Sequence, residues 1–175
     1  MSNVLIGIIG VILFIGLALA GALFLGPRFQ EATLNSKASA MMGAIGQASH
    51  AANLYRLQTG NDVPGNAVGD APVVAALVNG GYLKAVPVTN EYGVGYRADD
   101  GAVAPTRPTL TVNGIADTPE GRKLCSVIAR QSGMTLDADG NAPSTDTPTG
   151  VGGCFRIKSA WGSLPVGFMI AYQRI

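Results

Sequence analysis

The first 60 residues carry a continuous helical pattern whose two halves differ in character. No side chain is charged between Val4 and Leu25, and at 1.5 Å per residue this apolar run spans about 33 Å, enough to cross a bilayer. The pattern passes through Gly26-Pro27 into an amphipathic stretch that ends near Thr59, so the whole helix would reach about 80 Å. One small domain cannot cover a helix of that length. Its exposed apolar surface therefore needs a partner, either lipid or further copies of the chain.

The amphipathic half carries one apolar stripe. Small and apolar residues recur there every three or four positions, the spacing of one helix face: Leu34, Ala38, Met41, Ile45, Ala48, Ala52 and Tyr55. This stripe predicts that the second half of the helix packs on a globular domain. Gly60 is well placed as the residue that follows the helix end. At Gly26-Pro27 the missing proline amide and the flexible glycine predict a kink or an unwound turn.

Small residues are spaced four apart in the apolar half. The pairs are Gly16 with Ala20, Ala18 with Ala22, and Ala22 with Gly26. This spacing lets membrane helices approach closely, which favours packing of helix on helix over a solitary anchor. Gly and Ala are also common in membrane helices in general, and spacing alone leaves both interpretations open.

Composition and pattern together predict an α+β fold in three parts. Residues 1–27 form a hydrophobic helix that lipid or further copies of the chain would cover, 28–60 form the amphipathic helix, and 61–175 form a globular head domain. Most of the 24 glycines and 10 prolines lie after Gly60, which indicates short elements joined by loops.

Two helices and three strands are predicted in the head domain. One helix carries Pro72 in its first turn and stops at Gly80-Gly81, and the other starts at Thr118 and ends at Gly133. The candidate strands are Leu110–Val112, Phe155–Lys158 and Gly167–Gln173. The last of these is apolar on both faces, so we expect it in the interior of the sheet.

The cysteines indicate an oxidising compartment. Cys125 and Cys154 are the only two, they lack metal-like spacing, and two lone cysteines in a Gly-rich exported domain most often pair. On the chain-entropy account, closing this loop would stabilise the fold by about 3–4 kcal/mol. The segment from Gly133 to Gly153 is too polar for a core, so we expect it on the surface.

The net charge and the apolar run limit where the protein can be located and what it can bind. The net charge is +1 and no basic run occurs, so a direct contact with nucleic acid is not expected. The apolar run is longer than the apolar region of a cleavable signal, so we expect it to be retained. Arg28, the first charge, weakly favours a cytoplasmic C-terminus, whereas the cysteines favour a head domain outside the cytoplasm, and we give the cysteines more weight.

No residue pattern indicates catalysis or a cofactor. His50 is the only histidine and has no ligand-like neighbour on the long helix. Asp99-Asp100-Gly101 is typical of a hairpin turn, and no glycine run has the context of a nucleotide loop. Lys158 and Ser159 are adjacent on a predicted strand, where they would point to opposite faces, which argues against a Ser–Lys nucleophile.

One loop resembles the start of a calcium site. The oxygen-bearing residues Asp137, Asp139 and Asn141 alternate there, as ligands do in calcium loops. The Glu that completes such a loop is missing, and Asp146 is a possible substitute. A solvated turn is the stronger interpretation, so no metal site is assigned.

Four features in this order resemble a type IV pilin, most closely a type IVb pilin of the toxin-coregulated or bundle-forming kind, or a related pseudopilin. They are the apolar helix that continues into the amphipathic stripe, the segment Tyr55–Pro64 (YRLQTGNDVP), the segment Gly81–Pro87 (GYLKAVP) and the late cysteine pair. The resemblance implies a long N-terminal helix whose second half packs on an antiparallel sheet, and a disulfide that bounds a variable region. It also implies a filament in which the apolar helix halves form the core.

The resemblance assigns assembly to the first half of the helix. On this basis Gly7, Gly16, Ala20, Gly26 and Pro27 are the candidate packing residues. Members of the family typically have a Glu at the fifth mature position, where this chain has Leu5. A leader that ends in Gly is missing as well, so Met1 is either a processed terminus or the initiator.

The leading hypothesis is the structural subunit of an extracellular type IV-like pilus, with a role in adhesion, DNA transfer or motility. The expected partners are other copies of the chain, the inner membrane before assembly, and the pilus assembly machinery. A minor or tip pilin or a secretion pseudopilin is the second hypothesis, since Leu5 stands where Glu is usual. The third is a monomeric, membrane-anchored periplasmic binding domain.

Overall fold

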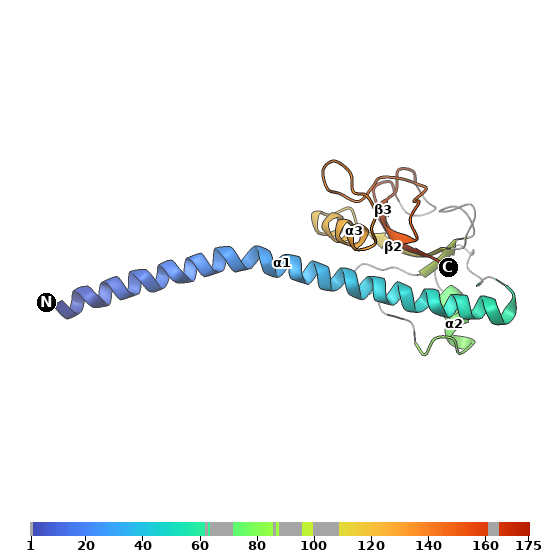
Figure 1. Ribbon diagram of the computed structural model, residues 1–175, viewed down its shortest axis with the longest axis horizontal. Helices are drawn as coiled ribbons and strands as arrows, with labels where there is room; N and C mark the ends of the chain where they lie inside the picture. Colours follow the sequence, from blue (N-terminus) through green and yellow to red (C-terminus); the bar gives the residue numbers. More distant parts are fainter. Residues whose placement is uncertain are drawn as a thin grey trace. The chain divides into compact units, whose positions relative to one another are not determined.

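The computed structural model describes residues 2–61, 63, 72–85, 87, 96–99, 109–160 and 165–175 (Figure 1). The fold is α+β, with a long N-terminal helix, a small antiparallel sheet and one disulfide. Packing divides the chain into two compact units, Met1–Ser36 and Lys37–Ile175, so the division falls inside the long helix. The three parts expected from sequence character are a different division and stay a prediction.

Helix α1 extends from Ser2 to Thr59 and ends where the sequence predicts. Gly60 adopts a φ of 70°, which a residue with a side chain rarely takes, and its amide donates to the carbonyl of Arg56 at 2.9 Å. The Thr59 hydroxyl donates to the carbonyl of Tyr55 at 2.8 Å. The Gly60 amide thereby satisfies one of the last four helix carbonyls, which have no partner within the helix.

The predicted stripe is the buried face of the second half of α1. Between Lys37 and Thr59 its members Ala38, Met41, Ile45, Ala48 and Ala52 are buried, and Tyr55 is half-buried. Ala44, Ser49 and Ala51 are buried as well, so the covered face is wider than the stripe. The head packs against it at several points: the Tyr55 and Tyr82 rings meet edge to face at 5.4 Å, and Lys37 pairs with Glu120 at 3.3 Å.

The sheet is antiparallel throughout, with strand order β1-β2-β4-β3. Its strands are β1 (Tyr96–Asp99), β2 (Thr109–Ile115), β3 (Gly152–Arg156) and β4 (Met169–Arg174). The expectation of an interior C-terminal strand is confirmed, because β4 lies between β2 and β3. β1 is a strand that the sequence analysis did not predict, and the turn expected at Asp100-Gly101 lies outside the described residues.

The predicted bounds of β3 are wrong. The strand begins three residues earlier than Phe155 and ends at Arg156, although the Ile157 amide still donates to the Phe168 carbonyl at 3.0 Å. Glycines disfavour strands, which hid its start. Gly153 is needed there because a Cβ at this position would lie 2.0 Å from the Met134 sulfur.

Both predicted helices of the head are present. Helix α2 (Pro72–Asn79) stops at Gly80-Gly81, and helix α3 (Pro119–Gln131) is followed by Ser132 and Gly133. The Thr118 hydroxyl caps α3 by accepting a hydrogen bond from the Gly121 amide at 3.1 Å. The periodic apolar residues of α3 are its buried face: Leu124, Cys125, Ile128 and Ala129.

A disulfide joins α3 to β3, as the sequence predicts. It links Cys125 to Cys154, whose Cα atoms lie 5.2 Å apart and which are both fully buried. Phe155, the next residue along β3, packs edge to face on Tyr172 in a core cluster with Ile157 and Ile170. The disulfide therefore fixes both ends of the polar segment between α3 and β3.

Replacing both cysteines by serine should destabilise the head by about 3–4 kcal/mol, because the unfolded chain regains the entropy of an open loop of 29 residues. Denaturant unfolding of the Cys125→Ser, Cys154→Ser double variant measures this loss. Limited proteolysis should cut the double variant within 133–153 and leave the native head intact there. Quantitative labelling of two free thiols in native protein would contradict the disulfide.

Candidate assembly surface

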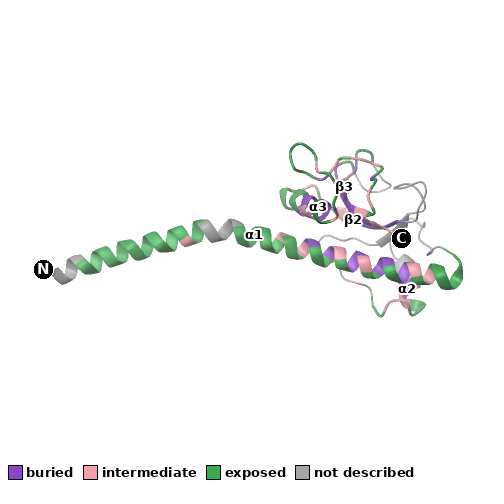
Figure 2. Cartoon of the chain, in the orientation of Figure 1, coloured by how far each residue is buried: buried purple, intermediate pink, exposed green. Residues whose placement is uncertain are grey.

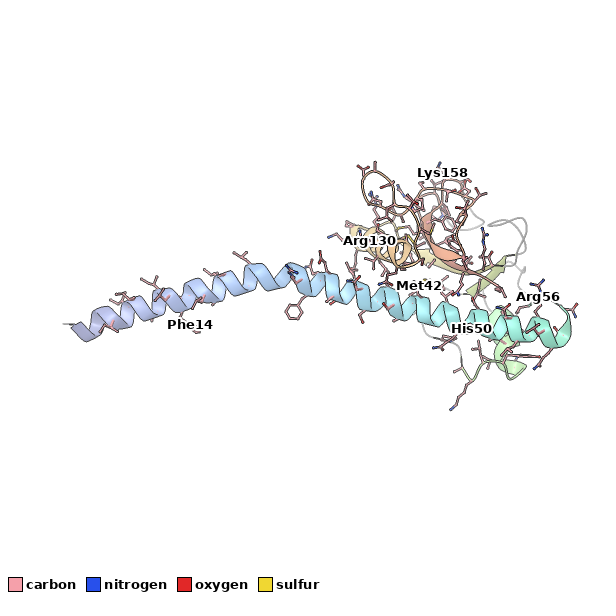
Figure 3. All side chains as sticks on the ribbon, viewed as in Figure 1. Phe14, Met42, His50, Arg56, Arg130 and Lys158 are labelled. Carbon is pink, nitrogen blue, oxygen red and sulfur yellow. A yellow bond between two sulfur atoms is a disulfide. The ribbon has the colours of Figure 1, made fainter. Side chains whose placement is uncertain are left out.

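The first half of α1 presents an apolar surface that its own unit leaves uncovered. Ile6, Phe14 and Leu23 are 66%, 74% and 76% exposed, and Phe14 projects from the helix into open space (Figure 3). Figure 2 shows exposed residues along almost all of this stretch. The helix is long and apolar enough to cross a membrane, with a mean hydropathy of 2.8 over an 18-residue window. Patches this large on soluble monomers mark contacts with lipid or protein.

The small residues on this surface are not required by the chain's own fold. A Cβ added at Gly7 or Gly16 would meet no atom within 4 Å, and Ala20 is exposed. Each glycine in a helix interior costs roughly 0.5–1 kcal/mol relative to alanine. Nothing in the described part of the chain offsets that cost, whereas close approach of another helix would.

The unwound turn expected at Gly26-Pro27 is absent from this chain. Residues 24–30 are α-helical, so the expectation of lost helix is wrong for the single chain. Proline has no amide to donate, so this turn lacks one hydrogen bond although it remains part of α1. The kink, the other alternative expected at this turn, stays a prediction.

In the 137–141 loop, where oxygen-bearing residues alternate, the Asp137 side chain stabilises a backbone turn. One Asp137 carboxylate oxygen accepts hydrogen bonds from the amides of Asp139 at 3.0 Å and Asn141 at 2.7 Å, and the Gly140 amide donates to the Asp137 carbonyl. The carboxylate is thus directed at its own backbone. This geometry favours the turn over the calcium interpretation.

Asp146, the possible later ligand, closes a different loop. Its carboxylate accepts from the Lys158 amide at 2.7 Å, from the Ser159 amide and from the Ser159 hydroxyl. These bonds hold the pKa of Asp146 below its usual value, the Ser159 hydroxyl being the largest cause. The sequence analysis placed Lys158 and Ser159 on a strand, and that placement is wrong. Both residues lie in a bend beyond β3.

Asp117 joins the start of α3 to β3. Its two carboxylate oxygens accept from Arg122 at 2.5 Å and from Arg156 at 2.7 Å. The hydrogen bond from Arg122 is the largest cause that lowers the pKa of Asp117. Sequence reasoning missed this cluster because Arg156 is far away in sequence, although an Asp just before the Thr118 cap is a local signal.

The head also carries an open groove of about 450 Å³ beside β3. Its lining is uncharged and comes from α1, the end of α3, β3 and β4: Ser39, Met42, Gln131, Ser132, Val151, Gly152 and Gln173. His50 is exposed on α1 (Figure 3), and among the described residues no group of three His, Cys, Asp or Glu side chains could hold a metal ion. No protein-family model, no curated protein and no solved structure matches the chain.

Leucine at both Gly16 and Ala20 should leave the protein in the membrane but prevent the helices from packing closely. The added side chains meet nothing within the chain at Gly16, so a loss of assembly would report contacts between chains. The measurement is the ratio of assembled to membrane-embedded protein. The control is Leu19→Ile, which conserves volume on the same helix. An unchanged ratio in the double variant would exclude packing through this face.

The head should lose stability in acid, because two carboxyl groups have a lowered pKa in the folded state. For Asp117 and Asp146 the contribution is complete above the pKa of the unfolded chain, near 3.9, and is lost as the pH falls through the lower folded value. Asp146→Asn should flatten this dependence, whereas Asp139→Asn, an exposed carboxylate of the neighbouring loop, should not. Unfolding midpoints between pH 7 and pH 2 measure the difference, and equal slopes for the two variants would contradict it.

Proposed function

We propose that this chain is a structural subunit, a pilin, of an extracellular type IV-like pilus. The observation that carries the proposal is the uncovered apolar half of α1, whose glycines have no use within the chain. A lipid bilayer can solvate the apolar side chains but gives no reason for the glycines. Close packing against identical helices accounts for both features.

The head fits the outer part of such a filament. Its core is complete without the first 36 residues, since the buried hydrophobic residues of the described chain begin at Ala38. A disulfide and the capped loops around Asp137 and Asp146 suit a domain that is exposed outside the cell. Each copy then contributes a self-sufficient head and a helix that needs neighbours.

The proposal sets the order of locations and partners. The apolar helix first lies in the inner membrane, where it is solvated by lipid, and then moves into a homopolymer with the help of an assembly machinery. The exchange is thermodynamically feasible because apolar side chains are satisfied in both settings. Adhesion, DNA transfer and motility are the roles that such a filament would support.

Two other functions have specific observations in their favour. A minor pilin or pseudopilin fits Leu5, which stands where the resemblance implies a Glu. A membrane-anchored binding domain fits the groove beside β3, whose wall includes the buried Ser132 hydroxyl with no hydrogen-bond partner among the described residues. The copy number of the chain in a filament distinguishes a minor pilin from the main subunit. Capture of a ligand by the monomer would distinguish a binding domain from both.

A sheared cell-surface fraction tests the proposal directly. Mass spectrometry should find this chain as the dominant protein, and electron microscopy of the same fraction should show filaments that antibodies against the head decorate along their length. Decoration at the ends alone would favour the minor or tip pilin. Recovery of the chain only as detergent-solubilised monomers would overturn the proposal.

A further inference from the structure

Only two charged side chains lie within the N-terminal unit of 36 residues. They are Arg28 and Glu31, of opposite sign, directly after the apolar run. Both are exposed, and no ion pair or hydrogen bond joins either side chain to another group in the described part of the chain. The unit therefore presents one base and one acid with no partner of its own.

The two residues sit on the helix in the order that is less favourable for a pair within the chain. They are three apart, and an acid that precedes a base along a helix interacts better than the reverse order found here. On an ideal helix Glu31 lies about 20° around the axis from Ala20, and Arg28 about 80°. Glu31 therefore continues the face that carries the small residues Gly16 and Ala20, whereas Arg28, about 120° from Gly16, flanks that face.

We propose that Arg28 of one copy pairs with Glu31 of the next copy and sets the axial register of the assembled helices. This inference rests on the proposed function. Apolar contacts are not directional, so helices packed through residues 6–25 could slide with little loss of energy. A charge beside such a bundle is costly unless it is paired, and the pair is strong only at short distance. The ion pair therefore selects one offset among many.

The pairing also explains an open assembly. If Arg28 of one helix lies at the same height as Glu31 of a parallel neighbour, the two helices are displaced by about 4.5 Å along the axis. Because both side chains are long, they can also pair at somewhat different displacements. Each copy then uses its base toward one neighbour and its acid toward another. Such a head-to-tail contact does not close on itself and generates a helical filament. An antiparallel arrangement would satisfy both charges within a closed dimer.

Charge exchange tests the pair. Arg28→Glu and Glu31→Arg alone place like charges together, and each should lower the filament yield at least tenfold relative to membrane-embedded protein. The double variant with both changes restores opposite charges and should recover most of the yield. Cells that produce the two single variants together should form mixed filaments, because one supplies two acids and the other two bases. Lys123→Glu, the same charge change on the exposed surface of α3, is the control and should have no effect.

The outcomes separate this inference from the proposed function. Wild-type filaments with unchanged yields in both single variants would overturn the register pair and leave the pilus standing. A second outcome is that only Arg28→Glu lowers the filament yield, that less protein is found in the membrane, and that the second change gives no rescue. This outcome would assign Arg28 to lipid headgroups and would also overturn the register pair. Closed dimers of the wild-type chain would support an antiparallel pair instead. Absence of wild-type filaments would overturn both proposals.

Discussion

The structure depends on one constraint: a single helix carries two apolar surfaces, and the packing of the described chain buries only the second of them. The second half of α1 meets its own sheet, and the small side chains of Ala38, Ala48 and Ala52 become fully buried there. The first half has the same helical backbone but larger exposed side chains, such as Phe14 and Leu23, which its own unit does not cover. Folding of the chain therefore buries only part of its apolar surface. Contact of the remaining surface with lipid or protein would contribute roughly 25 cal/mol for each Å² removed from water.

The second unit, Lys37–Ile175, contains its own buried core. Its sheet places β4 in the centre, so the largest buried side chains of β3 and β4 meet in one cluster around Phe155 and Tyr172. The long segments that join the elements are held by few but specific contacts. Asp117 holds the start of α3 to β3, Asp146 holds the bend after β3, and the disulfide fixes α3 against the sheet. Each contact joins residues distant in sequence, which limits the entropy of the loops between them.

Periodic and capped elements were predictable from sequence because their signals are local. The stripe of α1, the Thr118 cap and the two-sided apolar character of β4 each report on neighbours within a few residues. The start of β3 was not predictable, since Gly153 is explained by its φ of 152° and by the close approach of Met134, both of which depend on the folded head. The role of Asp146 was hidden for the same reason, because its partners lie 12 and 13 residues away. The candidate packing residues of the apolar half were named from the resemblance, and the single chain adds only that a Cβ at Gly7 or Gly16 would meet nothing within 4 Å.

The separation of head and apolar helix has a consequence for variation under the proposed function. Loop 133–153 satisfies many of its polar groups internally, as the Asp137 turn illustrates, and it forms no part of the uncovered surface of α1. Substitutions at exposed positions of that loop would alter what the head presents without altering the contacts available to the first half of α1. The reverse also holds, because a change at Gly16 meets no atom of the folded chain. Presentation and assembly are thus determined by different residues, and the helix that links them is the one element that must satisfy both.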